Sequence, residues 1–240
     1  MRKAPAEAIR RAKGLDNFDK RGMTRGMNLL LAAALGFLLG SIPFGLILTR
    51  AAGLGDVRQI GSGSIGATNV LRTGNKGLAL ATVLLDAGKG VAAVLLAKAF
   101  LSGGESAMVA GIAAVGAVAG HCYTPWLAFK GGKGFATAAG VCGALSWPLM
   151  LACAGVWAAT VAVFRISSVA SLASVSFAVV ATFLAPFLGF EALAPLFLPM
   201  IAIQVIVVIK HSENIKRLLA GQEPKIGASK KAEAKGAEHP

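Results

Sequence analysis

Long apolar segments, separated by short polar ones, run through most of this chain. Seven of them are candidate membrane crossings, at roughly 28–48, 78–100, 106–127, 135–147, 149–164, 168–188 and 192–209, since a hydrocarbon core about 30 Å thick takes about 20 apolar residues of helix. The fourth and fifth segments are short. They meet at Ser146-Trp147-Pro148, where the proline predicts a tight turn because it cannot continue a preceding helical turn. The pattern predicts an all-α, polytopic integral membrane protein with about seven transmembrane helices.

The composition agrees with a membrane protein. Hydrophobic residues make up 55% of the 240 residues and charged residues only 15%, which is too apolar for an ordinary soluble domain. The net charge of +13 would suggest a nucleic-acid partner in a soluble protein. Here the basic residues lie mostly in loops and tails, so positive-inside topology and anionic lipid headgroups explain them better, and no nucleic-acid partner is expected. The three cysteines form no CxxC pair, so neither a disulfide framework nor a metal site is expected.

Basic residues occupy alternate loops. The loops at 49–77 and 128–134, Arg165 and the tail from Lys210 are basic, whereas the intervening loops carry acids and no Lys or Arg. Because cytoplasmic loops carry the excess of Lys and Arg, the basic loops and the C-terminus are predicted to face the cytoplasm. Seven crossings then place the N-terminus outside.

The first 26 residues conflict with that topology, because they contain eight Lys or Arg against three acids and should resist export. Either the chain start is miscalled and the protein begins at Met23 or Met27, which we favour, or the later loops force the topology. We therefore expect a basic extension at 1–26 that is disordered or not native, a membrane domain at 27–227 and a disordered tail at 228–240.

The polar segment Gly61–Gly77, GSGSIGATNVLRTGNKG, is too rich in glycine, hydroxyl and cationic residues for a simple connector. Glycines permit positive φ, so that successive backbone N–H groups can point into one concavity. The planar guanidinium of an arginine suits the oxygens of a phosphate group. The sequence predicts a phosphate site here, whose candidate ligands are Gly61, Ser62, Gly63, Ser64, Thr68, Asn69 and Arg72.

Two further segments on the same predicted face are basic. FKGGKG, residues 129–134, is a glycine-rich turn before a helix and therefore a candidate anion site, with candidate ligands Gly131, Gly132, Lys133 and Gly134. It is not a Walker loop, because no Ser or Thr follows Lys133. In the tail, His211 and Asn214 are three residues apart and share a face if the helix continues, whereas Lys216 and Arg217 are placed at the headgroups.

Charged residues also occur within the second crossing. Asp86 and Lys89 are three residues apart, which allows a mutual pair, and we favour a structural pair over a catalytic role. His121 ends the third crossing on the same predicted face and is a further candidate for binding the substrate or its phosphate. The chain has no HxxxxD arrangement at His121 or His211 and no GxSxG, which disfavours a His-Asp acyltransferase and a serine-hydrolase elbow.

Taken together in order, these motifs resemble one known family, the bacterial acyl-phosphate:glycerol-3-phosphate acyltransferases (the membrane-integral PlsY family). The resemblance covers about residues 27–227, and Ser64 departs from it, since the family usually has Asn there. The motifs that carry it are GSIPFGLIL (40–48), GSGSIGATNVLR (61–72), LLDAGKG (84–90), GH (120–121), FKGGKGFAT (129–137) and HSENIKRLLAGQEPKIG (211–227).

The resemblance implies a seven-crossing membrane enzyme of the bacterial cytoplasmic (inner) membrane, with a cytoplasm-facing site and no cofactor. It implies transfer of a fatty acyl group from acyl phosphate to the 1-hydroxyl of sn-glycerol 3-phosphate, giving lysophosphatidic acid and phosphate at the start of phospholipid synthesis. The partners implied are these two substrates, the bilayer and a soluble acyl-phosphate-producing enzyme. By the family motifs Ser62, Arg72, Lys133, His211 and Asn214 are the catalytic candidates. A membrane transporter of an organic phosphate is the alternative.

Overall fold

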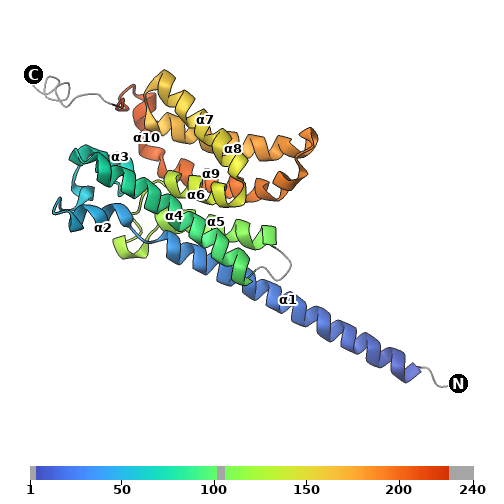
Figure 1. The fold of residues 1–240 in the computed structure, drawn as a ribbon. Coiled ribbons are helices and arrows are strands. Elements are labelled where there is room, and N and C mark those ends of the chain that lie inside the picture. Colours follow the sequence, from blue (N-terminus) through green and yellow to red (C-terminus); the bar gives the residue numbers. More distant parts are fainter. Residues whose placement is uncertain (1–3, 102–105, 227–240) are drawn as a thin grey trace, which may run out of the picture.

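A computed structural model describes residues 4–101 and 106–226, with side chains from residue 22 onward, and these residues are helical except for turns and loops. The long helices form a bundle (Figure 1). The helices are α1 (Ala4–Gly40), α2 (Phe44–Ala51), α3 (Ala67–Val70), α4 (Lys76–Leu101), α5 (Ser106–Cys122), α6 (Phe135–Leu145), α7 (Trp147–Phe164), α8 (Ser167–Leu184), α9 (Phe197–Lys210) and α10 (Ser212–Leu219).

Six segments of the described chain are long and apolar enough to cross a membrane, and the shorter apolar α6 accompanies them. The all-helical membrane fold is thus confirmed, and about seven crossings is compatible with it. The six segments start and end close to the predicted ones. As predicted, the chain turns between α6 and α7, where the Ser146 hydroxyl accepts a hydrogen bond from the Leu149 amide and caps α7.

Helix α5 lies at the centre of the bundle and packs against α1, α4, α6 and α9. Its contact with α1 depends on small residues. Gly36 and Gly40 of α1 sit directly on the backbone of Ala113 and Ala117, so that a β-carbon at either glycine would collide with an α5 carbonyl. Small residues at four-residue spacing allow this close approach of helices in lipid.

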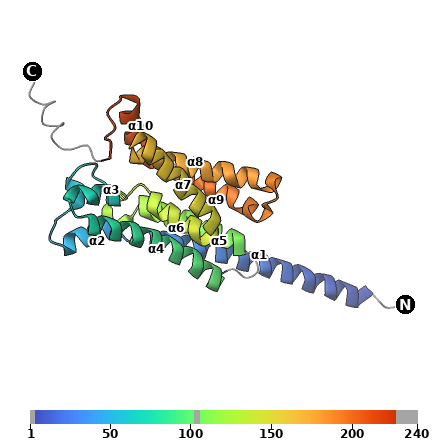
Figure 2. The ribbon, with the colours of Figure 1, turned by 45° about the horizontal axis from the view of Figure 1, so that its top comes forward.

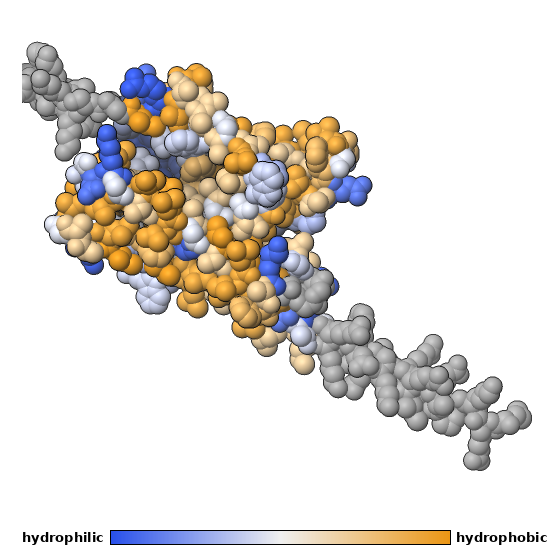
Figure 3. Space-filling model, in the orientation of Figure 1, coloured by the Kyte–Doolittle hydropathy of each residue, from blue (hydrophilic) through white to orange (hydrophobic). Residues whose placement is uncertain are grey.

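The short helices α2, α3 and α10 gather at one end of the bundle, and α1 leaves it at the opposite end (Figures 1 and 2). The predicted polar loops around residues 61–77 and the segment after α9 therefore lie on the same side. On the face shown in Figure 3, most of the bundle surface is apolar, and polar residues lie around a hollow at that end.

Of the two predicted boundaries of the membrane domain, residue 27 is among the described residues and residue 227 is not. Helix α1 begins at Ala4, so residues 4–26 form helix that continues into the first crossing. The boundary at residue 27 and the miscalled start stay predictions. The tail at 228–240 lies outside the described residues.

Candidate active site

The first polar loop is built around the side chain of Asn69, which is 1% exposed. Its amide nitrogen lies 2.7 Å from the Val57 carbonyl oxygen, 3.1 Å from that of Ile60 and 2.8 Å from that of Ser64. Its side-chain oxygen accepts from the Ser62 amide at 3.1 Å. The side chain is thus occupied with loop backbone groups, so its role is to shape the loop, contrary to the prediction that Asn69 contacts phosphate.

Arg72 lies over this loop at the mouth of a cavity. Its guanidinium is 3.5 Å from the Asn69 side-chain oxygen and packs on Gly61, whose φ is +54°. A β-carbon at Gly61 would collide with that guanidinium. The absence of a side chain at Gly61 therefore leaves room for the arginine. The remaining edges of the planar cation stay available to an anion at the mouth.

The second loop is held by the end of α5. The amide of Gly131 donates to the Cys122 carbonyl at 3.3 Å, and the amide of Gly132 donates to the His121 carbonyl at 3.0 Å. Gly63 behaves similarly, because its amide donates to the Ile60 carbonyl at 3.1 Å. The amides near Gly63 and Gly132, predicted to bind phosphate, are thus already bonded to backbone carbonyls, and phosphate binding at these glycines stays a prediction. They fix the loops that carry the charged side chains.

The segment after α9 forms a network around the Glu223 carboxylate. Its oxygens accept hydrogen bonds from the Asn214 amide, from Ser168 at 2.7 Å and from Arg217 at 2.8 Å. Asn214 is 4% exposed, and its side-chain oxygen finds no donor within the described residues. A buried oxygen without a partner is a place for a ligand donor.

Lys133 and His211 share an environment that disfavours positive charge. Burial, helped by nearby Arg217 and Arg72 and opposed by Glu223, lowers the pKa of Lys133 to about 8. Burial also lowers the pKa of His211, and Lys133 contributes to that shift. The Nδ1 atom of His211 is 2.8 Å from the Val207 carbonyl oxygen, which places the proton of a neutral ring on Nδ1.

The two charged residues of the second crossing form the predicted pair. The Lys89 ammonium is 2.7 Å from the Asp86 carboxylate, 2.9 Å from Nδ1 of His121 and 2.7 Å from the Ile42 carbonyl oxygen. All three side chains are 4% exposed or less. Because the His121 ring lies against Gly132, this network packs against the loop that carries Lys133.

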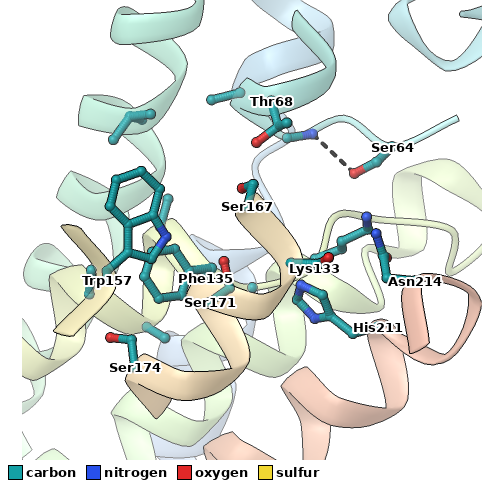
Figure 4. Close-up of a pocket in the computed structure, with 18 of the residues that line it drawn as sticks. Ser64, Thr68, Lys133, Phe135, Trp157, Ser167, Ser171, Ser174, His211 and Asn214 are labelled. Atoms are coloured by element: carbon teal, nitrogen blue, oxygen red, sulfur yellow. Dashed lines mark hydrogen bonds between the residues drawn. The ribbon is translucent and has the colours of Figure 1, made fainter. Parts of the chain in front are cut away.

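One cavity of about 1190 Å³ joins the three loops. Its mouth is polar and cationic, and Figure 4 shows Lys133, His211 and Asn214 on one side of it with Thr68 and Ser64 above. Its inner part runs between helices α6, α7, α8 and α9. The apolar side chains at the inner part include Ala138, Cys142, Met150, Cys153, Ala154, Val175, Ala178, Met200 and Ile203.

Most of the residues predicted for the site line this cavity. They are Gly61, Ser62, Ser64, Thr68, Asn69, Arg72, His121, Lys133, Gly134, His211 and Asn214, and Asp86 also reaches it. Gly63, Gly131, Gly132 and Lys89 are not among its lining residues.

Several lining residues were missed by the sequence reasoning. Arg217 was placed at the headgroups, yet it lines the cavity. Glu223 could have been noticed, because it is an acid in an otherwise basic segment. Ser167, Ser168 and Trp157 carry no signal of their own in the sequence. Within the described residues no cluster of three or more His, Cys, Asp or Glu could hold a metal ion.

The family model described as glycerol-3-phosphate acyltransferase matches residues 30–221. A glycerol-3-phosphate acyltransferase of Mesorhizobium japonicum is 56% identical over 206 residues, which cover 86% of this chain and 99% of that protein. One of Paramagnetospirillum magneticum is 54% identical over 209 residues, covering 86% and 98%. The crystal structure of PlsY, an integral membrane glycerol 3-phosphate acyltransferase, in its glycerol 3-phosphate form is similar with a TM-score of 0.72 and 33% identity, covering 83% of this chain and 96% of that one. Its lysophosphatidic acid form gives 0.71 and 32%, covering 83% and 95%.

Proposed function

This chain belongs to the glycerol-3-phosphate acyltransferase family, and we propose that it transfers a fatty acyl group from acyl phosphate to the 1-hydroxyl of sn-glycerol 3-phosphate. The products are lysophosphatidic acid and inorganic phosphate. The protein is a multi-pass membrane enzyme, and we place it in the bacterial cytoplasmic membrane with its site and C-terminus toward the cytoplasm.

The observation that carries this proposal is the two-part cavity. Its mouth gathers the cations Arg72, Lys133 and Arg217, and its inner part is an apolar chamber between four helices. Ser167 at the mouth and Ala178 on the chamber wall are eleven residues apart on α8, which is about 16 Å along the helix. A ligand with a phosphate at one end and a long alkyl chain at the other fits such a cavity, because the chain is buried while the phosphate meets the cations.

The residues at the mouth take separate roles. Arg72 and Lys133 bind phosphate oxygens, and Arg217, held by Glu223, adds positive charge beside them. The hydroxyls of Ser62 and Thr68 donate to the same oxygens. The resemblance to the family supports the roles of Ser62, Arg72 and Lys133, and the geometry adds Arg217.

Asn214 and His211 orient the acceptor alcohol. The amide group of Asn214 donates to Glu223, which leaves its buried oxygen to accept a hydrogen bond from a hydroxyl of glycerol 3-phosphate. His211 is neutral at pH 7 because its pKa is lowered, and its Nε2 presents a lone pair. Both side chains therefore offer hydrogen-bond acceptors to the hydroxyl groups of glycerol 3-phosphate, beside the cations that bind its phosphate.

The chemistry needs positioning more than a nucleophile. Acyl phosphate is a mixed anhydride with a good leaving group, so holding the hydroxyl against the carbonyl carbon supplies much of the acceleration. Cations at the mouth stabilise the charge that moves onto the departing phosphate. We assign the hydroxyl proton to that substrate phosphate and not to a side chain.

The remaining partners follow from the location of the mouth. Glycerol 3-phosphate reaches it from the aqueous side, and the acyl donor enters with its chain in the bilayer. A soluble enzyme that produces acyl phosphate is the partner expected at this face. The transporter alternative has no support, because the relatives and solved structures that resemble this chain are acyltransferases.

The proposal is tested by an acyl-transfer assay with the protein purified in detergent. Labelled glycerol 3-phosphate is supplied with palmitoyl phosphate or, in parallel, with palmitoyl-CoA. Labelled lysophosphatidic acid from palmitoyl phosphate alone is the expected result. Product from the CoA donor alone would overturn the assignment of the donor, and uptake of label into proteoliposomes without product would overturn the assignment as an acyltransferase.

A further inference from the structure

One polar group inside the cavity has no hydrogen-bond partner among the described residues, and none of the roles assigned so far uses it. The indole N–H of Trp157 is buried, and no acceptor for it lies within the described residues. Trp157 lines the cavity. A buried donor without a partner costs free energy, and tryptophan N–H groups usually find an acceptor when buried. The missing acceptor is therefore expected to arrive with a ligand.

The packing of the indole holds this donor in one place. The ring stacks on Phe135, with the ring centroids 6.2 Å apart and the planes inclined by 19°. Phe135 is the first residue of α6 and follows Lys133 by two positions. Figure 4 shows the indole nitrogen on the edge of the ring that is turned toward Phe135 and Ser171. The donor is thus fixed relative to the loop that binds phosphate.

This place is the boundary between the two parts of the cavity. Lys133 and Ser167 mark the polar mouth, whereas Cys153 and Ala154, one turn earlier on α7, belong to the apolar chamber. An acyl phosphate bound with its phosphate at the mouth and its chain in the chamber brings one further acceptor to this boundary, namely the oxygen of its acyl carbonyl. Every acyl donor carries that atom at that position, whatever its chain length.

We propose that Trp157 Nε1 donates a hydrogen bond to the carbonyl oxygen of the acyl donor and is a further catalytic residue. The inference rests on the proposed function. As the 1-hydroxyl oxygen bonds to the carbonyl carbon, negative charge develops on the carbonyl oxygen. The bond from that carbon to the phosphate oxygen then breaks, and the hydroxyl proton leaves with the phosphate. Trp157 exchanges no proton. Its hydrogen bond to the carbonyl oxygen becomes stronger as negative charge develops on that oxygen.

The test is the Trp157→Phe variant, which removes the N–H and keeps an aromatic ring to stack on Phe135. We expect kcat with palmitoyl phosphate to fall about 100-fold, the loss typical of one oxyanion donor. The KM values should change little, because the hydrogen bond is stronger in the transition state than in the bound substrate. Trp147→Phe is the matched control, since Trp147 lies exposed at the other end of α7, and it should leave kcat unchanged.

A spectroscopic measurement separates this role from packing alone. Palmitoyl phosphonate carries the carbonyl on a stable P–C bond and can be labelled with ¹³C at that carbon. The infrared stretch of the bound carbonyl should lie at higher frequency in Trp157→Phe than in the unchanged enzyme and in Trp147→Phe, since a donor to the oxygen is lost.

The outcomes are distinguishable. A kcat within about threefold of the unchanged enzyme, or a carbonyl band that does not move, overturns the role of Trp157 while the proposed function stands. If the unchanged enzyme makes no lysophosphatidic acid from palmitoyl phosphate, the proposed function fails, and this inference fails with it. A band that moves together with a loss of kcat supports the inference.

Discussion

Lys133 gives the sharpest test of how the mouth binds phosphate. Burial and the neighbouring guanidinium groups lower its pKa to about 8. With that pKa the side chain is about 90% charged at pH 7 and about 10% charged at pH 9. Only the charged form attracts a phosphate dianion. We therefore predict that kcat/KM for palmitoyl phosphate falls about tenfold per pH unit above about pH 8.

The direction of the effect follows from the order of the pKa values. The proton of Lys133 is lost from the free enzyme as the pH rises through about 8. Phosphate esters lose their second proton near pH 6, and the pKa of His211 is lowered from its ordinary value, so both titrate on the acid side. A bound dianion raises the pKa of Lys133 again. The alkaline limb of kcat should therefore lie at higher pH than that of kcat/KM.

Lys133→Arg isolates this effect, because a guanidinium stays charged throughout the range. Initial rates are measured between pH 6 and 9.5, after the spontaneous hydrolysis of the acyl phosphate is subtracted. The variant should lose the alkaline limb even if its rate at pH 7 is lower. Lys130→Arg, at an exposed position of the same loop, should keep the limb. An unchanged limb in Lys133→Arg would show that another group titrates and that the reasoning is wrong.

Three further predictions follow from the same geometry. Arg72→Ala should lower kcat/KM by about 100-fold or more, and Arg72→Lys should not restore it, since a planar bidentate cation has no local replacement. Full activity in the lysine variant would refute the bidentate contact. His211→Ala should lower the rate but keep the acid limb of the pH–rate profile, because substrate phosphate takes the proton. Loss of that limb in initial-rate data would instead identify His211 as the base. Lys89→Met should destabilise the protein by about 3–5 kcal/mol, because the buried Asp86 loses its cation and keeps only His121, at 3.5 Å, beside it. Thermal unfolding in detergent measures this, and the double variant with Asp86→Leu should recover much of the loss.

The membrane fold could be predicted from the sequence because its signal is summed over long segments. Each crossing is a run of apolar residues, and a few errors in its composition do not change the assignment. The Ser146-Trp147-Pro148 turn was predictable for a local reason, because a proline and a capping serine act through their immediate neighbours. The placement of the three polar segments on one side of the bundle was also predictable, since alternate loops of a bundle share a face, whereas the single cavity that joins them was not.

The roles of individual polar atoms could not be predicted in the same way. Asn69 has a side chain that could bind phosphate, yet its amide nitrogen donates to carbonyl oxygens of its own loop. The Gly132 amide donates to the His121 carbonyl at the end of α5, a partner that the glycine-rich motif itself does not indicate. Trp157 looks like any aromatic residue in an apolar helix, and its free N–H becomes visible only when its neighbours are known. Hydrogen-bond partners depend on tertiary distances, which no local pattern contains.

The central claim is that one cavity holds the phosphate at its cationic mouth and the acyl chain between α6, α7, α8 and α9. The most direct test is photo-crosslinking with an acyl phosphate of palmitoyl length that carries a diazirine at its chain end. Mass spectrometry of the labelled protein should find the adduct on chamber residues such as Met150, Ala178 or Met200, and excess palmitoyl phosphate should remove it. Label that instead lies on the outer faces of α1 and α4, or that excess palmitoyl phosphate does not displace, would contradict the account.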